Sequence, residues 1–152
     1  MKVFKSLLAV SALSLIMTSG CTVAGGSDAG IIKTLSSDQL MEVLSKEGLV
    51  PEKKDKDVIR VKMDQVGVLF FVSDSKENIQ AYAGFESDDT TCAKVNEWNA
   101  DKRYSRAYLD DEDDPVIELD LDLAGGITQE RLIDFIDTVR LSVTEFKKHI
   151  FD

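Results

Sequence analysis

The chain has 152 residues, of which 43% are hydrophobic and 30% charged, and this is the length and composition of one globular domain with a packed core. The formal net charge of −10 argues against nucleic acid, whose phosphates need Lys and Arg, and against electrostatic docking on anionic lipid. An acidic surface mainly favours solubility and indicates basic partners only weakly.

The first 20 residues have the pattern of a signal peptide. Lys2 and Lys5 form a basic start, and residues 7–17 form an apolar run. This run is too short to cross about 30 Å of hydrocarbon as a helix, so it is typical of a secretion signal and not of a membrane span. We therefore expect residues 1–20 to be removed during export.

The end of this signal resembles a bacterial lipobox. Ser19, Gly20 and Cys21 match such a motif, whereas Thr18 stands where these signals usually carry Leu. The resemblance implies that Cys21 is acylated, and Thr22 after it implies sorting to the outer membrane. Each buried methylene contributes about 0.8 kcal/mol, so several acyl chains would hold the protein stably in the membrane. The alternative is ordinary cleavage, which leaves a soluble periplasmic protein.

A Gly-rich segment follows the predicted lipid attachment site. Residues 21–33 are expected to be the lipidated Cys and a flexible tether, because they contain few side chains that a core would bury. The folded domain is expected over residues 34–152. With Cys21 acylated, Cys92 has no partner for a disulfide within the chain.

The first predicted helix runs from about residue 37 to residue 47. Ser36 is its expected N-cap, Gln39 the capping-box partner and Gly48 the stop. The charged residues 52–57 that follow are predicted to be a solvated loop, with a docking patch as the alternative.

Three strands are predicted next. Residues 59–63 and 79–85 alternate between apolar and polar side chains, which is typical of half-buried strands. Residues 66–72 are apolar at successive positions, so this strand is expected to be central or to meet a partner with its outer face. The short polar connection at 73–78 predicts an antiparallel hairpin between the last two strands.

A short helix capped by Asp89 or Thr90 is predicted after these strands, with Cys92, Val95 and Trp98 on a buried stripe. Cys92 is interpreted as a small buried hydrophobe and not as a reactive thiol.

Strands are predicted at 104–109 and 116–123, joined by the acidic turn 110–115. The last helix begins after the cap Thr128 and carries one apolar face over about 36 Å, at 1.5 Å per residue.

The middle of the chain resembles the YbjN family of bacterial proteins, also described as sensory transduction regulators. The resemblance is carried by Val95–Asn99, Arg103–Leu109, Ile117–Asp120 and Gly125–Thr128, and it extends from about Leu35 to Phe151. It implies an α+β fold like that of type III secretion chaperones, with element order α-β-β-β-α-β-β-α and a twisted antiparallel sheet packed against helices. The family offers no established catalytic residues to carry over.

The residues themselves do not assemble a catalytic or metal motif. A nucleophile needs a neighbouring base, and the single His149 lies near the chain end, off the main stripe of its helix. The acidic turn lacks the Gly and the ligand alternation of a calcium loop, and Pro115 closes it. No enzyme activity, cofactor or metal is therefore predicted, and the weak metal candidates are the five acids of the turn: Asp110, Asp111, Glu112, Asp113 and Asp114.

The sequence thus predicts a non-enzymatic, periplasmic module that is protein-binding, chaperone-like or regulatory, and tethered to the membrane only by its lipid. Its partner is expected to be an unknown protein or a second copy. The predicted contact residues come from the apolar strand and the long last helix: Val68, Phe70, Val143, Phe146 and Ile150. The alternative is a periplasmic sensor that binds a small ligand or divalent cation at the acidic turn, and an uncharacterised enzyme is the third hypothesis.

Overall fold

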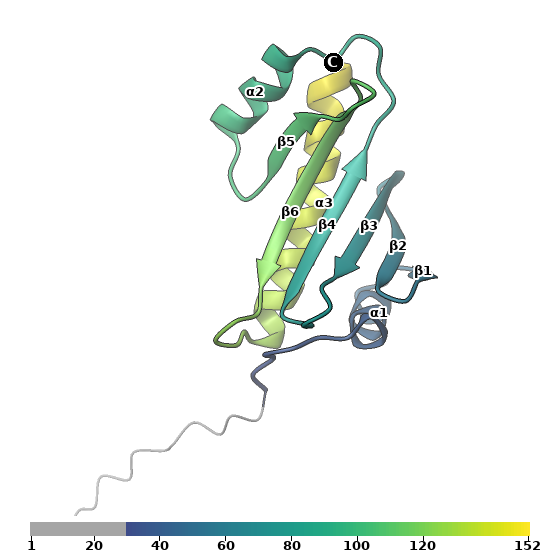
Figure 1. Cartoon of the computed structure of the whole chain (residues 1–152), viewed down its shortest axis with the longest axis vertical. Helices are drawn as coiled ribbons and strands as arrows, with labels where there is room; N and C mark the ends of the chain where they lie inside the picture. The colour runs from purple at the N-terminus through teal and green to yellow at the C-terminus, as the bar shows by residue number, and fades with distance from the viewer. Residues whose placement is uncertain (1–29) are drawn as a thin grey trace, which may run out of the picture.

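One antiparallel sheet of six strands, in the order β1-β2-β3-β4-β6-β5, organises the fold (Figure 1). The structure is a computed structural model that describes residues 30–152, so the predicted signal peptide and Cys21 lie outside the described residues. The strands are β1 (Glu52–Asp55), β2 (Val58–Met63), β3 (Val66–Val72), β4 (Asn78–Gly84), β5 (Arg106–Leu109) and β6 (Pro115–Asp122). The helices are α1 (Ser37–Lys46), α2 (Cys92–Asp101) and α3 (Gln129–Phe151).

The α+β class, the antiparallel sheet and the β3–β4 hairpin are confirmed. The predicted loop at 52–57 is wrong in part, because Glu52–Asp55 adds a sixth strand that pairs with β2. All four of its side chains are exposed, so no apolar alternation marks the strand in the sequence. Its position depends on long-range contacts: Lys53 pairs with Asp38 at 2.7 Å, and the Ser37 hydroxyl donates to the Lys56 carbonyl at 2.8 Å.

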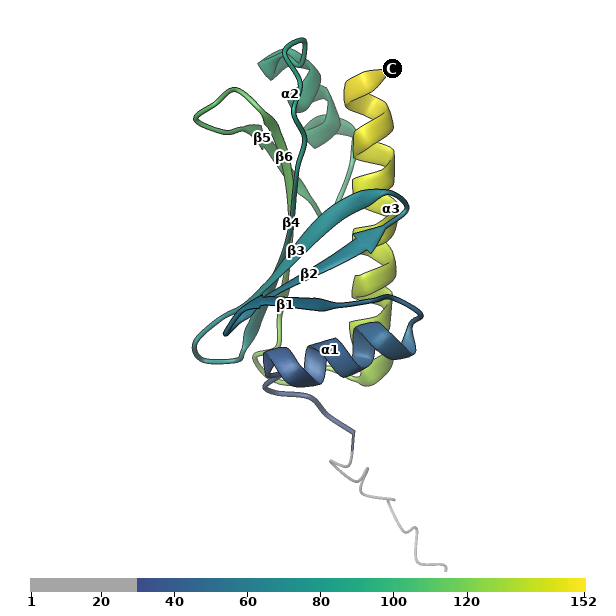
Figure 2. The ribbon, with the colours of Figure 1, turned by 90° about the vertical axis from the view of Figure 1, so that its right-hand side faces the viewer.

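The hydrophobic core lies between one face of the sheet and α3, which runs along the sheet for most of its length (Figure 2). Alternate residues of β2, β3, β4 and β6 point into it, as expected for strands covered on one face. No helix within residues 30–152 is long and apolar enough to cross a membrane.

The residues predicted to contact a partner are part of this core. The five side chains are at most 5% exposed within the single chain: Val68, Phe70, Val143, Phe146 and Ile150. Side chains buried this far offer no surface to another molecule in this conformation, so the prediction is corrected. The C-terminal part of α3 is covered within the same chain, because Trp98 of α2 and Phe85 after β4 make edge contacts with Phe146.

The first backbone contact with the folded domain lies at Ile32, before residue 34, where the domain was predicted to begin. The backbone of Ile32 forms a β-bridge with Ile127, with N–O distances of 2.7 and 2.9 Å, and the Leu35 amide donates to the Lys76 carbonyl. Residues 30–33, assigned to the flexible tether from the sequence, therefore include a backbone contact to the turn before α3.

Side-chain hydrogen bonds at the N-caps define where each helix begins. The Ser36–Gln39 capping box of α1 is confirmed, as is the Thr128 cap of α3. The cap of α2 is Thr91, one residue later than predicted, and its hydroxyl accepts from the Lys94 amide. Cys92 is consequently the first residue of the helix and is exposed, so its assignment as a buried hydrophobe is wrong.

Helix α2 closes the outer edge of the sheet at β5. The Asn99 side-chain amide donates to the Ala107 carbonyl at 2.8 Å, and its oxygen accepts from the Ala107 amide at 2.9 Å. Trp98 packs edge-on against Phe146 and donates to the Ser105 hydroxyl at 3.0 Å. Because Asn99 meets the backbone groups that a neighbouring strand would meet, this part of the edge is not free to pair with another chain.

Candidate partner-binding face of the sheet

The face of the sheet opposite α3 is uncovered by any helix within residues 30–152 (Figure 2). The β3–β4 and β5–β6 turns both bend away from α3, so this face is concave (Figure 2). We call it the open face and define it by the outward-pointing residues of five strands: Arg60, Leu69, Phe71, Gln80, Tyr82, Arg106, Tyr108, Val116, Glu118 and Asp120.

The strand register places five of these residues in one row across the sheet. Arg60 pairs with Leu69, Leu69 with Tyr82, Tyr82 with Glu118, and Glu118 with Arg106. Neighbouring strands lie about 4.8 Å apart, so the row spans about 19 Å. Leu69 and Tyr82 form an apolar middle, Arg60 lies at one end, and the ion pair of Glu118 and Arg106 lies at the other.

Glu118 is the most deeply buried charged side chain of this face, with 6% exposure. Its carboxylate accepts a hydrogen bond from the Tyr108 hydroxyl at 2.8 Å and forms an ion pair with Arg106. The Arg106 guanidinium also lies over the Tyr108 ring, 5.6 Å from its centroid. Two donors thus satisfy the Glu118 carboxylate, as a buried charge requires.

This cluster changes the ionisation of both partners of Glu118. Burial, together with the hydrogen bond to Glu118, raises the pKa of Tyr108 to about 12. The hydrogen bond and the attraction of the same carboxylate raise the pKa of Arg106 above its ordinary value. Tyr108 therefore stays a neutral donor and Arg106 a cation throughout the physiological range.

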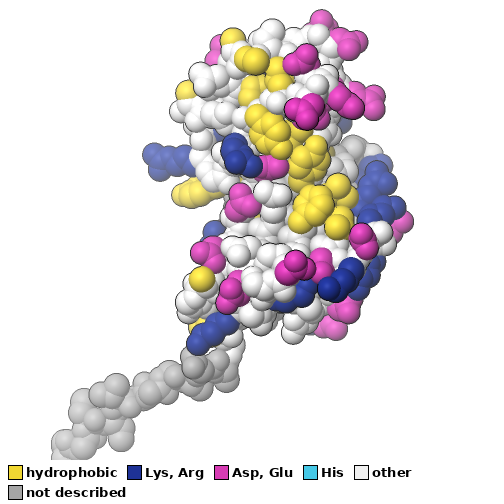
Figure 3. All heavy atoms as spheres, in the orientation of Figure 1, with side chains coloured by type: hydrophobic (Ala, Val, Ile, Leu, Met, Phe, Trp, Pro, Cys, Tyr) yellow, Lys and Arg dark blue, Asp and Glu magenta, His cyan; other side chains and the backbone are white. Residues whose placement is uncertain are grey.

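The middle of the open face is apolar. Tyr82 and Phe71 meet edge-on with ring centroids 6.3 Å apart, and Leu69 is the cross-strand neighbour of Tyr82. A Cβ at Gly84 would lie 3.2 Å from the Tyr82 hydroxyl, so the absent side chain gives the Tyr82 ring room along β4. Figure 3 shows hydrophobic side chains in a band across this face, with acidic side chains beyond one end.

The acidic turn at 110–114 borders that band. Oδ1 of Asp110 accepts from the backbone amides of Glu112 and Asp114, at 2.9 and 3.0 Å, and Asp114 accepts from the Ser87 amide at 3.1 Å. Burial, and then the nearby charges of Asp110, Glu118 and Asp114, raise the pKa of Tyr82.

Two of the five weak metal candidates, Asp110 and Asp114, therefore hold the turn itself. Within residues 30–152 no group of three or more His, Cys, Asp or Glu side chains is arranged to hold a metal ion.

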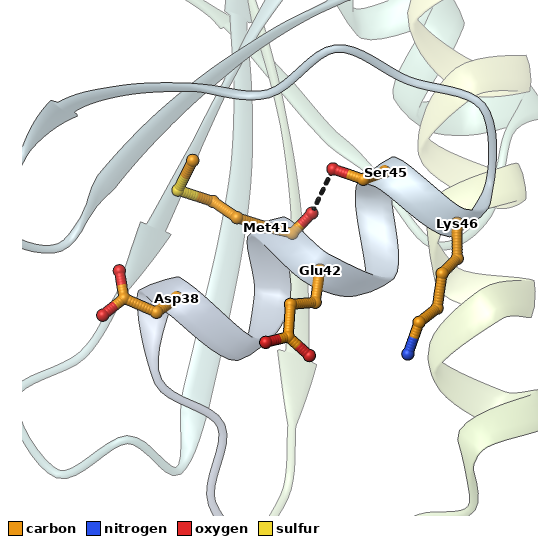
Figure 4. A pocket seen from close by; sticks show the side chains of 5 residues that line it. All are labelled: Asp38, Met41, Glu42, Ser45 and Lys46. Carbon is orange, nitrogen blue, oxygen red and sulfur yellow. Dashed lines mark hydrogen bonds between the residues drawn. The ribbon is translucent and has the colours of Figure 1, made fainter.

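Two other hollows lie on the described surface, away from the open face. One, along the outer side of α1, is lined by a single helix: Asp38, Met41, Glu42, Ser45 and Lys46 (Figure 4). Its charged groups do not converge on a common point (Figure 4). The other lies between the end of α2 and α3, where Tyr104 and Leu141 are exposed beside Trp98.

Sequence reasoning offered the outer face of residues 66–72 as a partner contact, but it named the inward Val68 and Phe70 and not Leu69 and Phe71. Glu118 and Asp120 both lie on the open face, where Glu118 is buried and Asp120 is exposed. The usable signal was the apolar or aromatic residues at outward positions, namely Leu69, Phe71, Tyr82 and Tyr108. A strand with one solvated face normally carries polar side chains at such positions.

A six-stranded antiparallel sheet with a long helix on one face and an aromatic patch on the other is a small α+β architecture. Residues 36–152 match the YbjN family, whose description is "Putative bacterial sensory transduction regulator", and the chain belongs to this family.

The fold is also similar to that of a solved structure described as "YbjN, a putative transcription regulator from E. coli". The TM-score is 0.60 at 18% sequence identity, and the similarity covers 71% of this chain and 85% of that one. A search of curated proteins finds no match.

Proposed function

We propose that this protein is a non-enzymatic regulatory module that binds another protein through its open face. The observation that carries the proposal is the uncovered patch of Leu69, Phe71, Tyr82 and Tyr108 in the middle of a sheet whose other face is fully packed. Contiguous apolar side chains with a polar border are typical of protein interaction sites, and Tyr and Arg are enriched in such contacts.

Side chains of the types that often act in catalysis make structural contacts here, which is consistent with a binding role. A ring nitrogen of His149 lies 2.7 Å from the Lys94 carbonyl, and the ring packs against Trp98, so His149 connects α3 to α2. Glu118 is engaged by Arg106 and Tyr108. These contacts give both residues structural roles within the fold.

The proposed location is the periplasm, with the domain held at the outer membrane by acylated Cys21. The features that support it are the signal-like residues 1–20 and the lipobox-like Ser19-Gly20-Cys21. The described chain enters the domain at the end opposite the C-terminus of α3 (Figure 1). A tether from Cys21 to the Ile32 bridge would reach about 35 Å if fully extended.

The location is tested by fractionating cells that express the wild-type protein or the Cys21→Ala variant and by labelling them with a fatty-acid probe. We expect label and membrane association only for the wild type. A Cys21→Ala protein that still fractionates with membranes would refute the lipid anchor.

The binding role is tested by placing a photo-crosslinking amino acid at Phe71, in the open face, and at Glu42, on the outer side of α1, as a matched control. We expect a discrete crosslinked protein from Phe71 in intact cells and none from Glu42. The same crosslinks from both positions, or none from Phe71 under growth conditions in which the protein is expressed, would contradict the proposal.

A further inference from the structure

We infer that the open face is built to receive a basic amphipathic segment of its partner, with an apolar side chain over Leu69 and Phe71 and a Lys or Arg at the Glu118 end. The inference rests on the proposed function, because it specifies which kind of segment that face would bind. The added content is the charge of the partner segment and its orientation on the open face.

The charges around the aromatic patch are unbalanced. Asp110, Asp114 and Glu118 act on the Tyr82 hydroxyl, and Asp120 acts on Arg106 from the neighbouring position of β6. Three carboxylates therefore act on Tyr82 and two on Arg106, with Glu118 common to both sets. The exposed Asp111, Glu112 and Asp113 extend this excess of negative charge along the turn.

At the Glu118 end of the patch, one aromatic ring already contacts a cation. The Arg106 guanidinium lies over the Tyr108 ring at 5.6 Å, within the range of a cation–π contact. The neighbouring Tyr82 ring has carboxylates around its hydroxyl and is half-buried with no cation over it among the contacts within residues 30–152. A Lys or Arg from a partner would meet an aromatic surface and surplus negative charge at the same place.

The opposite end of the patch has the opposite sign. Arg60 lies beside Leu69, and Lys62 is the next outward residue of β2. Leu69 and Glu118 are two strands apart in the same row, which corresponds to about 10 Å. A helix covers this distance in about seven residues and an extended chain in about three, so one short segment can place an apolar side chain and a cation correctly.

A second copy of the chain fits this face less well. Each copy has a formal net charge of −10, so two open faces brought together also bring two acidic turns into one interface. Charge complementarity favours a basic segment of another protein. Self-association through the open face is therefore an outcome that would count against the inference.

The inference is tested with the purified full-length protein and two labelled peptides of equal length, one built from Lys and Leu and the other from Glu and Leu with the same helical spacing. Fluorescence anisotropy reports their binding at physiological salt. The first variant is Asp111→Asn/Glu112→Gln/Asp113→Asn, which neutralises exposed acids of the turn and keeps Asp110 and Asp114. The matched control is Glu42→Gln/Glu97→Gln/Asp137→Asn, which removes the same charge from the exposed sides of the three helices.

We expect the Lys/Leu peptide to bind and the Glu/Leu peptide not to bind. We also expect the turn variant to raise the dissociation constant of the Lys/Leu peptide about fivefold to tenfold, while the control variant changes it less than about twofold. Phe71→Ser should weaken binding at least as much as the turn variant. Equal binding of both peptides, with loss in Phe71→Ser, would overturn the basic segment but retain the open face as a binding site.

Equal effects of the two charge variants would mean that net charge alone attracts the peptide, and this would also overturn the inference. Binding that Phe71→Ser does not change, absence of binding by either peptide, or a dimer in sedimentation that Phe71→Ser dissociates would overturn it as well. The crosslinking experiment at Phe71 then decides independently whether the proposed function fails with it.

Discussion

The two faces of the sheet carry apolar side chains in different ways. The face toward α3 is sealed, with Phe70 and Phe146 fully buried, whereas Leu69 and Phe71 on the open face are only half-buried. Residues of β3 thus alternate between the packed core and the half-buried open face. The difference teaches that a run of apolar residues, such as 66–72, does not mean that both faces of its strand are packed.

The largest expected effect tests whether the sealed face dominates stability. Phe146→Ala should lower the free energy of unfolding by about 3–5 kcal/mol, because it opens a cavity between Trp98 and Phe85. Phe71→Ala removes the same atoms from the open face and should lower it by less than about 1.5 kcal/mol. Urea denaturation followed by Trp98 fluorescence measures both, and equal losses would refute the distinction between the faces.

The next effect concerns how the edge of the sheet is closed. Asn99→Ala should destabilise the protein by about 1–2 kcal/mol, because it removes both hydrogen bonds to Ala107. Asn96→Ala, at an exposed position of the same helix, is the matched control and should change stability by less than about 0.5 kcal/mol. Thermal denaturation compares the two variants. A cost for Asn96→Ala as large as that for Asn99→Ala would show that α2 does not close the β5 edge through Asn99.

A third prediction uses the ionisation of the open face. The raised pKa of Tyr108, about 12, means that the folded state favours the neutral phenol. The stability from this preference is fully present below the ordinary tyrosine pKa of about 10 and is lost as the pH rises through the folded pKa. We expect the free energy of unfolding to fall more steeply between these values in the wild type than in Tyr108→Phe.

The two causes of the raised Tyr108 pKa, burial and the Glu118 carboxylate, can be separated by mutation. Glu118→Gln keeps the shape of the side chain and removes its charge, so the pKa of Tyr108 should move back toward 10 while burial retains part of the shift. Tyrosinate absorbance against pH gives the measurement, with Tyr104→Phe to subtract an exposed tyrosine. An unchanged titration in Glu118→Gln would remove the carboxylate from the explanation.

The smallest expected effect separates binding from stability. Gly84→Ala places a methyl group 3.2 Å from the Tyr82 hydroxyl, so the ring must shift by a few tenths of an ångström. The free energy of unfolding should change by less than about 1 kcal/mol, because the end of the Tyr82 side chain can move and Ala loses less conformational entropy than Gly when a strand folds. If Tyr82 shapes the binding surface, affinity for the Lys/Leu peptide should fall while stability holds. A loss of stability comparable to that of Phe146→Ala would show that the open face is structural.

The sequence predicted most of the elements because their signals are local. The capping box at Ser36 and Gln39, the alternation of Ile59, Val61 and Met63, and the stripe of the last helix all depend on residues within two turns or one strand. The charged strand β1 was missed because it is held by pairing with β2 and by contacts to α1, which no local pattern of the sequence marks. Cys92 was misplaced because it is the first residue of α2, where the side chain is exposed although Val95 and Trp98 of the same stripe are buried.

The candidate site was not predictable to the same degree. Periodicity marks which side chains share a face but not which face a helix will cover, so Phe70 and Phe146 were assigned to an interface that the fold itself forms. The burial of Glu118 was not predictable, because its partners, Arg106 and Tyr108, reach it only across the pairing of β5 with β6. The row from Arg60 to Arg106 combines residues from five strands, and no window of the sequence contains it.

The sequence by itself determined the class of fold, most element boundaries, the family resemblance and the acidic character, because hydrophobic period, capping and composition are encoded in neighbouring residues. Only the tertiary structure decided that α3 seals one face, that α2 closes the β5 edge, and that an aromatic patch bordered by carboxylates remains open. These outcomes depend on strand order and register. Both arise from contacts between segments far apart in the chain, which local patterns do not specify.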